Sequence, residues 1–368
     1  MDREGGNTLK PLRLLALTHY GKQGASSRMR TWQYLPVMKQ AGIEVQVQAL
    51  IDDATLLNRY QEGAYRFGAL LRRYAMRLNA LWGRQQFDLL WIEKEALPWL
   101  PLWMEWALLR DVPYVLDFDD AVFHNYDRHR LAAVRCLYGA RLDRLMAKAA
   151  LVVCGNPYLR DRAQAAGAQW VELVPTVVDQ ARYPVQSLPA AKGVNEVPTI
   201  VWIGSPSTAR YLQLLERPLQ LLALRLNFVL RVIGAEFKIP GVHVACVPWA
   251  EDTEVASIAV GHVGVMPLLD SPWERGKCGY KLIQYMACGL PVVASPVGVN
   301  TQIVEPGVNG FLANSDDAWV SALESLLTQA PLRERMGLAG RAKVDAQYCI
   351  QTTGPQMAQL LQRAAKGP

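Results

Sequence analysis

Short apolar runs alternate with helical segments along this chain, and the alternation stops once, near the middle, and then starts again. The first run, at 12–18, is followed by a loop of small residues, a helical pattern at 28–41 and a second apolar run at 43–50. This strand–helix–strand order predicts a parallel sheet covered by helices. Further strands are expected at 87–93, 113–118, 150–154 and 171–174, with a long Arg-rich helical region at 52–84.

The interruption lies at 178–198, where three prolines occur and no apolar face is sustained. The pattern restarts with strands at 199–203, 227–233, 241–247, 263–266 and 290–294, and with helices at 211–224, 316–329, 331–346 and 353–365. We therefore predict an α/β chain with two doubly wound domains facing a central cleft. The expected parts are a first domain at 1–177, a linker at 178–198, a second domain at 199–346 and a C-terminal helix at 347–368 that packs back toward the first domain. Ligands of such sheets bind where the carboxyl ends of the strands converge.

The amino-acid composition excludes some classes of protein and ligand. The 368 residues are 51% hydrophobic and carry a net charge of +6, spread along the chain, which excludes intrinsic disorder and favours a phosphate-bearing ligand over nucleic acid. Six cysteines without a CxxC pair indicate reduced thiols, and the polar first ten residues lack the apolar core of a signal peptide, so we expect a cytoplasmic protein. The most apolar stretch, 96–109, is too short to span a bilayer; it either packs in the core or seats the chain on a membrane surface.

One motif points to a family. Residues 281–306 contain MACGLPVVAS at 286–295, the glycine loop PVGVN at 296–300, and the start of QIVEPGVNGFL at 302–312. This string resembles the C-terminal signature of the two-domain GT-B glycosyltransferases, most closely the retaining family 4 enzymes of the group 1, mannosyltransferase and glycogen-synthase type. The resemblance implies two Rossmann-like domains, of which the first binds the acceptor and the second binds a nucleotide sugar.

The motif also departs from the family pattern. Gln284 stands where the family has a glutamate on the donor ribose, and Gly276 stands at its first glutamate, with Glu274 two residues upstream. Lys281 lies one helical turn before Gln284, and at the start of a helix it would suit a diphosphate. A glutamine still bonds a hydroxyl but adds no negative charge.

The second phosphate element resembles the family's G-R-x4-K-G turn. Here Gly204 opens the turn, Ser205 replaces the arginine, and Arg210 replaces the lysine with a guanidinium that can bind phosphate in a bidentate fashion. Ser205 and Ser207 either cap the following helix or donate to the diphosphate. Together with the first βα loop of the N-terminal half, the predicted donor-binding residues are Gly24, Ser27, Arg28, Gly204, Ser205, Ser207, Arg210, Trp249, Lys277, Lys281, Gln284, Gly298, Val299 and Asn300.

In the first domain, Arg28 and Arg30 stand in the first turn of a helix, where the helix dipole disfavours cations, so an anionic partner or a solvated face explains them. Asp119 and Asp120 end a strand, followed by His124. These carboxylates either hold a metal as an Asp-x-Asp site, or Asp119 or Asp120 orients the acceptor hydroxyl or holds an arginine; a helix cap and a packed histidine are the plain alternative. We favour the acceptor role without metal, and predict as catalytic residues Asp119, Asp120, His124, Arg210 and Lys281.

The sequence thus predicts a metal-independent, hexosyltransferase-type enzyme. It would move a sugar from a UDP- or GDP-sugar co-substrate to a glycan or lipid-linked hydroxyl, with retention, in bacterial surface polysaccharide or glycolipid synthesis. No other cofactor and no nucleic acid is expected, and peripheral contact with the inner face of the membrane is left open by the arginines of 59–84, which a solvated helix explains as well. A sugar-nucleotide epimerase or phosphorylase on the same fold and a non-catalytic partner subunit are the alternatives.

Overall fold

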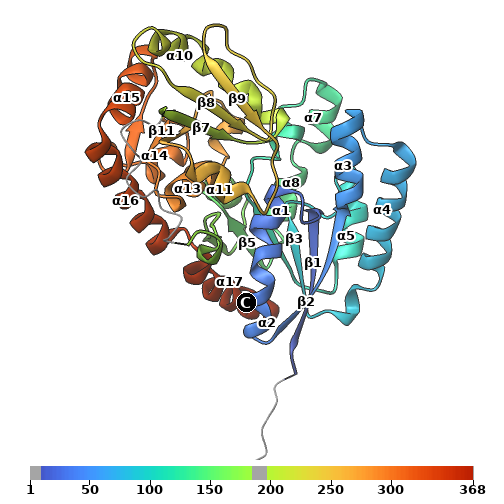
Figure 1. Ribbon diagram of the computed structural model, residues 1–368. Coiled ribbons are helices and arrows are strands. Elements are labelled where there is room, and N and C mark those ends of the chain that lie inside the picture. Colours follow the sequence, from blue (N-terminus) through green and yellow to red (C-terminus); the bar gives the residue numbers. More distant parts are fainter. Residues whose placement is uncertain (1–9, 185–196, 368) are drawn as a thin grey trace, which may run out of the picture. The chain divides into compact units, whose positions relative to one another are not determined.

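The computed structural model describes residues 10–184 and 197–367, and it divides into two compact units. The unit called here the first domain comprises Met1–Gly155, Leu159–Val174 and Gly354–Pro368, and the second domain comprises Asn156–Tyr158 and Pro175–Thr353. Each domain is a parallel sheet flanked by helices (Figure 1). The predicted α/β class with two doubly wound sheets is confirmed.

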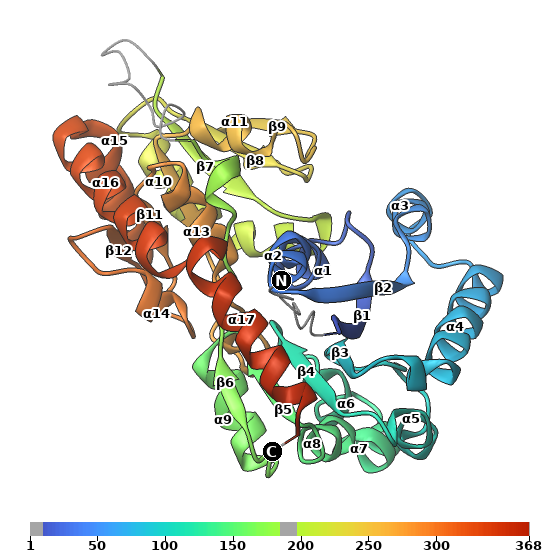
Figure 2. The ribbon, with the colours of Figure 1, turned by 90° about the horizontal axis from the view of Figure 1, so that it is seen from below.

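The first sheet has the strand order β2-β1-β3-β4-β5-β6. Its inner strands are almost fully buried, as expected for a parallel sheet covered on both faces. Helices α4 and α5 lie over one face, and α2 and the end of α17 over the other (Figure 2). The strands are β1 (Leu12–Tyr20), β2 (Ile43–Ile51), β3 (Leu89–Glu93), β4 (Tyr114–Phe118), β5 (Leu151–Cys154) and β6 (Val171–Leu173).

The prediction of one continuous helix at 28–41 is wrong. The chain forms α1, a 3-10 turn at Trp32–Tyr34 and then α2. Helix α1 ends at its C-cap Thr31, which has φ −128°, and Pro36 has no N–H to donate to the Trp32 carbonyl, so one continuous ladder cannot run through this segment. The helices of this domain are α1 (Ala25–Arg30), α2 (Leu35–Gln40), α3 (Asp53–Glu62), α4 (Phe67–Trp82), α5 (Leu102–Leu109), α6 (His124–Asp127), α7 (Ala132–Tyr138), α8 (Arg141–Met146), α9 (Pro157–Ala165) and the end of α17 (Ile350–Ala365).

The second sheet has the order β12-β11-β10-β7-β8-β9. Alternate side chains of β7 enter two separate cores: Ile200 and Trp202 pack with α10 and α15, whereas Val201 and Ile203 pack with α13. The strands are β7 (Thr199–Ile203), β8 (Val229–Ile233), β9 (His243–Val247), β10 (Val263–Met266), β11 (Val292–Ala294) and β12 (Gly310–Leu312).

The helix predicted at 211–224 also differs. A 3-10 helix, η5 (Pro206–Leu215), comes first, and α10 (Glu216–Ala223) follows. Pro218 cannot donate to the carbonyl four residues earlier, so an α-helix cannot run through this point without losing a hydrogen bond. The other helices are α11 (Glu254–Ala259), α12 (Pro272–Arg275), α13 (Tyr280–Ala287), α14 (Asn300–Ile303), α15 (Asp316–Thr328) and α16 (Ala330–Gln347).

Besides the short excursion of Asn156–Tyr158 into the second domain, the chain passes between the domains at Pro175 and at Gly354. After Pro175 it joins the second domain, where Val178 forms a β-bridge with Cys349 and Tyr183 O accepts a hydrogen bond from Arg341 (2.8 Å). Residues 185–196 of the linker predicted at 178–198 lie outside the described residues. Helix α17 returns the chain to the first domain at Gly354, and Gln362 Nε2 donates to Ala41 O (2.9 Å).

No helix in the described ranges is long and apolar enough to cross a membrane. All six cysteines are free thiols, and only Cys136 is exposed.

Candidate functional site

The turn after β7 gathers hydroxyl groups at the carboxyl end of the second sheet. Gly204 N donates to Ile233 O of the neighbouring strand (3.0 Å), which fixes the start of the turn. Ser205 then begins η5: its carbonyl accepts from Thr208 N (2.9 Å), and its Oγ lies 2.9 Å from Ser207 Oγ. The serines therefore hold the turn and also present hydroxyls at its surface, where Ser207 is exposed.

Lys281 reaches this turn from the first turn of α13. Its Nζ lies 5.1 Å from the ring centroid of Trp202. A Cβ at Gly204 would stand 2.7 Å from the same nitrogen, so a side chain there would collide with the ammonium group. Glycine thus leaves room beside the backbone of the turn for the lysine and for Trp202, whose Cη2 would lie 2.6 Å from the same Cβ.

Two further cations stand beside the same turn, around Tyr211. Arg210, whose side chain is 65% exposed, donates to the Tyr211 hydroxyl (3.2 Å), and Lys277 Nζ lies 6.0 Å from the Tyr211 ring centroid. The hydroxyl in turn donates to Glu274 Oε1 (2.5 Å). Burial favours the neutral carboxyl, but hydrogen bonds from Ser271 and Tyr211 outweigh it and lower the pKa of Glu274. Glu274 is therefore a charged anchor for Tyr211 and Arg210.

The predicted glycine loop packs against the start of α13. Gly298 has φ +54°, and a Cβ on it would lie 2.8 Å from Arg275 O. Gly279, the N-cap of α13, has φ +66° and would meet Ile303 and Val299 in the same way. Asn300 is buried and donates to Ser295 O (3.1 Å), so its side chain holds the loop, and the backbone is the part left to meet a ligand.

Asn156, which no motif singled out, supports this region. Its Nδ2 donates to Gly276 O (2.7 Å) and Lys277 O (3.0 Å) and is fully buried. The bonds fix the backbone from which the Lys277 side chain projects. A lone Asn far away in the sequence gives no local signal for this role.

Two predicted donor residues have internal partners. Gln284 is 3% exposed, and its Nε2 lies 3.4 Å from the Tyr183 hydroxyl, although Lys281 one turn earlier is partly exposed. Trp249 donates from Nε1 to Glu254 Oε2 (2.7 Å). To contact a ribose, the buried amide of Gln284 would have to move away from the Tyr183 hydroxyl. The donor role of Gln284 therefore stays a prediction.

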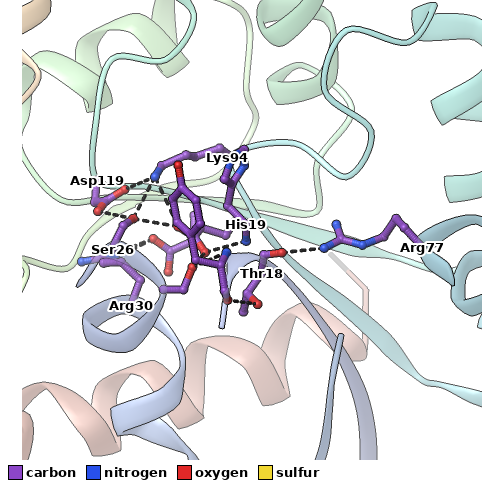
Figure 3. A network of polar contacts seen from close by, with 11 residues as sticks. Thr18, His19, Ser26, Arg30, Arg77, Lys94 and Asp119 are labelled. Carbon is purple, nitrogen blue, oxygen red and sulfur yellow. Dashed lines mark hydrogen bonds and ion pairs between the residues drawn. The ribbon is translucent and has the colours of Figure 1, made fainter. Parts of the chain in front are cut away.

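The first domain carries a buried network of charges at the carboxyl ends of β1, β3 and β4, centred on Lys94 (Figure 3). Lys94 Nζ lies 2.9 Å from Asp119 Oδ1 and 3.2 Å from Glu93 Oε1, and it donates to Ser26 Oγ (2.8 Å). Ser26 Oγ also lies within 2.7 Å of both carboxylates. Asp119 is thus paired with Lys94, a residue that the sequence analysis did not name.

The backbone at Lys94 is unusual. Its φ is +66°, a left-handed conformation that costs a non-glycine residue about 1 kcal/mol. The conformation is held because Lys94 N donates to Asp117 O (2.9 Å) while the side chain turns back to Asp119. Sequence patterns do not reveal this residue, since a lysine after a strand normally faces solvent.

The pKa values follow from burial and charge pairing. Burial alone would lower the pKa of Lys94, but Asp119 and Glu93 hold it well above its usual range. Burial would raise the pKa of Asp119, yet Lys94 and Ser26 lower it. Burial, and then Lys94, lower the pKa of His19 to about 4, so this imidazole is neutral at pH 7.

Arg30 has an internal anionic partner. Its guanidinium bonds Asp117 (Nε to Oδ1, 2.8 Å) and Val174 O (2.8 Å), and burial raises the pKa of Asp117 to about 6 despite the arginine. The prediction that Arg28 and Arg30 stand in the first turn of a helix is wrong: α1 begins at Ala25, and both lie in its last turn, where the helix dipole favours cations. Arg28 is also buried, whereas the prediction left a solvated face open for both.

The other predicted first-domain residues are placed by packing. Ser27 is buried and bonds Glu93, and a Cβ at Gly24 would lie 2.2 Å from Tyr20 Cβ. His124 is 7% exposed, with Nδ1 2.8 Å from Asp127 Oδ1. Asp119 and Asp120 are both partly exposed.

A second buried network fixes the loop between β3 and α5. Arg141 bonds both Glu95 (3.0 Å) and Glu105, and it donates to Leu97 O (2.7 Å). Burial raises the pKa of Glu95 to about 7. The loop presents Trp99, which has φ +63° and is 48% exposed beside Tyr126.

The described residues contain no group of three His, Cys, Asp or Glu arranged to hold a metal ion. In the predicted Asp-x-Asp element, Asp117 is paired with Arg30 and Asp119 with Lys94. These ion pairs already supply each carboxylate with a positive partner.

Comparison with solved structures identifies the fold. The Anabaena protein Alr3699/HepE, crystallised with UDP and glucose, superposes with a TM-score of 0.70 over 96% of this chain and all of that one, at 16% identity. The chain has the GT-B glycosyltransferase fold.

The match to a family model lies in the second domain of this GT-B chain. Residues 197–329 match the family of group 1 glycosyl transferases. The D-inositol 3-phosphate glycosyltransferase of Stackebrandtia nassauensis is 42% identical over 60 residues, or 16% of this chain and 14% of that protein. A GDP-mannose-dependent monoacylated alpha-(1-6)-phosphatidylinositol monomannoside mannosyltransferase of Corynebacterium glutamicum is 33% identical over 85 residues, or 23% of this chain and 22% of that protein. The matched segments thus span less than a quarter of these curated relatives, and the predicted resemblance is confirmed for the fold and for the group 1 domain.

Within the GT-B second domain, the structure brings together Gly204, Ser205, Ser207, Arg210, Lys277 and Lys281. Val299 packs beside the N-cap of α13, the helix that carries Lys281, and Gly298 packs against Arg275 at the end of α12. Gln284 and Asn300 point into the core.

Proposed function

We propose that this chain is a glycosyltransferase that takes a sugar from a UDP- or GDP-sugar and transfers it to a hydroxyl of a glycan or lipid-linked acceptor. The second domain binds the donor and the first domain the acceptor. The observation that carries the proposal is the set of three cations, Arg210, Lys277 and Lys281, gathered with serine hydroxyls around the Gly204 turn. A diphosphate is the ligand that such a set neutralises best.

The proposed mechanism is electrostatic. The bond between the anomeric carbon and the diphosphate oxygen breaks as the acceptor oxygen bonds the same carbon, and Lys281, Lys277 and Arg210 stabilise the charge that develops on the diphosphate. The acceptor proton passes to the departing phosphate oxygen, so the transfer needs no protein base and no metal. Attack on the face that the diphosphate leaves gives retention.

The setting proposed for this reaction is the synthesis of bacterial surface polysaccharide or glycolipid, in the cytoplasm. The C. glutamicum relative is by name a mannosyltransferase of a phosphatidylinositol mannoside, which supports a lipid-linked acceptor. HepE is by title a complex with UDP, which supports a nucleoside diphosphate as leaving group.

The test is binding of UDP, GDP, ADP and CMP by thermal shift and calorimetry, first without metal and then with Mg²⁺ or Mn²⁺. We expect one nucleoside diphosphate to raise Tm without metal, and Lys281→Ala to weaken its binding about 10- to 100-fold, as for loss of a charged hydrogen bond. Arg335→Ala is the control, because it removes one exposed cation from α16, away from these loops. Absence of any shift, or a shift only with metal, contradicts the proposed cation site.

A further inference from the structure

Helix α4 has two apolar faces. Its inner side packs on β2 and the neighbouring core through Leu70, Tyr74 and Leu81. Its outer side carries Phe67, Leu71 and Trp82, which are 80, 62 and 79% exposed. A helix on the surface of a globular protein normally buries one stripe and shows a polar opposite face, so the outer face of α4 departs from that pattern.

Phe67, Leu71 and Trp82 form a stripe along the helix, whereas Met76, which is 42% exposed, lies on another side of it at 3.6 residues per turn. Phe67 and Leu71 are one turn apart, and Trp82 lies about 22 Å from Phe67 along the axis, at 1.5 Å per residue. Helix α5, which packs beside α4, adds Trp103, 68% exposed. The exposed apolar stripe therefore runs the length of α4, with an aromatic side chain at each end.

The charged residues of α4 itself are all arginines, since the helix contains no Asp or Glu. Residues 63–87 contain five arginines and no Asp or Glu. Arg77 and Arg84 are buried, and Arg73 bonds the Leu50 and Ala49 carbonyls and Asp52. Arg72 and Arg66 are exposed, the latter beside Glu62 at the end of α3.

We infer that the outer face of α4 is a docking surface for an anionic membrane. The helix lies in the plane of the interface, with Phe67, Leu71 and Trp82 among the acyl chains and glycerol groups, and with Arg72 against lipid phosphates. Tryptophan and arginine favour this boundary, because each combines an apolar body with a polar end.

The charge pattern selects lipid over a protein partner. A stripe without carboxylates and with arginines beside it complements a continuous layer of phosphates, and each cation near such a surface strengthens binding. A second copy of this chain would bring the same arginines face to face, which repel one another. The docking surface does not depend on the donor site, so either proposal can fail alone.

The test is co-sedimentation of the full chain with vesicles of phosphatidylcholine, with and without phosphatidylglycerol. The key variant is Phe67→Ser/Leu71→Ser/Trp82→Ser; because these side chains are exposed, it is expected to fold, which circular dichroism and Tm check. The matched control is Leu224→Ser/Leu338→Ser, which removes leucines of 85 and 62% exposure from the second domain.

We expect the wild type and the control to sediment with phosphatidylglycerol vesicles, and the triple variant to remain in the supernatant. Arg72→Gln should weaken binding about fivefold on anionic vesicles, as for loss of one cation near the surface. Wild type that binds no vesicles, or a triple variant that binds as wild type does, overturns the inference. Light scattering that shows a dimer in the wild type and a monomer in the triple variant also overturns it, because the face then joins two copies.

Discussion

Replacing Lys94 with methionine tests the buried network of the first domain. Methionine nearly keeps the length of the side chain, and its backbone penalty at φ +66° is similar to that of lysine, so the substitution chiefly removes the charge. Asp119 and Glu93 then remain buried with no ammonium group at 2.9 and 3.2 Å.

The magnitude follows from these distances. At an effective dielectric constant of about 20, each ion pair contributes roughly 5–6 kcal/mol of Coulomb attraction, most of which offsets the desolvation of three buried charges. Removal of one partner of a buried pair leaves that desolvation uncompensated, and the free energy of unfolding at pH 7 should fall by about 3–5 kcal/mol. At about 2–4 °C per kcal/mol for a domain of this size, Tm should fall by about 10 °C.

The assay is urea and thermal unfolding of wild type, Lys94→Met, Asp119→Asn and the double variant at pH 7 and pH 5. Without Lys94, burial raises the pKa of the carboxyls above their unfolded values, so their contribution to stability is present at low pH and is lost as pH rises. The deficit of Lys94→Met should therefore shrink at pH 5, and Asp119→Asn should restore part of the stability in the double variant. A loss below about 1 kcal/mol at pH 7, or additive losses in the double variant, would refute the reasoning.

Three further results are expected. Gly204→Ala should weaken nucleoside-diphosphate binding about tenfold in calorimetry, because its methyl group displaces the Lys281 ammonium; an unchanged Kd contradicts this. Burial and Lys94 lower the pKa of His19 from 6.5 to about 4, so the folded state of the wild type should lose about 3 kcal/mol of stability as pH falls from 6.5 to 4. In urea unfolding, the stability of His19→Asn should depend less on pH than that of the wild type; parallel dependences contradict this. Gly298→Ala should cost about 2 kcal/mol, because φ is +54° and the new methyl meets a carbonyl oxygen at 2.8 Å; near-normal urea midpoints contradict that.

Much of the fold could be predicted from the sequence, because its signals are local. Strands β7 and β10 have the predicted bounds, Thr199–Ile203 and Val263–Met266, since each is a buried apolar run between loop residues. The helices at 28–41 and 211–224 were mispredicted where apolar periodicity continues through Pro36 or Pro218. There the missing N–H donor outweighed the periodicity.

The sequence predicted those residues of the candidate donor site that belong to a recognisable motif. The Gly204 turn, Arg210 and Lys281 were identified from their resemblance to a family pattern, and the structure gathers them. Asn156 was missed, because it meets the backbone of Lys277 from more than a hundred residues away in the chain.

What only the tertiary structure decided is the state of the charged side chains. From the sequence alone, Lys94 resembles a surface lysine. Arg30 resembles a cation that binds an anionic ligand, and Gln284 resembles a residue that contacts the donor ribose. In the fold, the first two are buried against carboxylates of other strands, and the third faces Tyr183. Hydrophobic patterning determines which segments form the sheets, because the burial of a strand depends on the apolar character of residues that are neighbours along the chain. Ion pairing and burial of single side chains depend on distances of a few ångströms between segments far apart in sequence, and these distances exist only once the chain has folded.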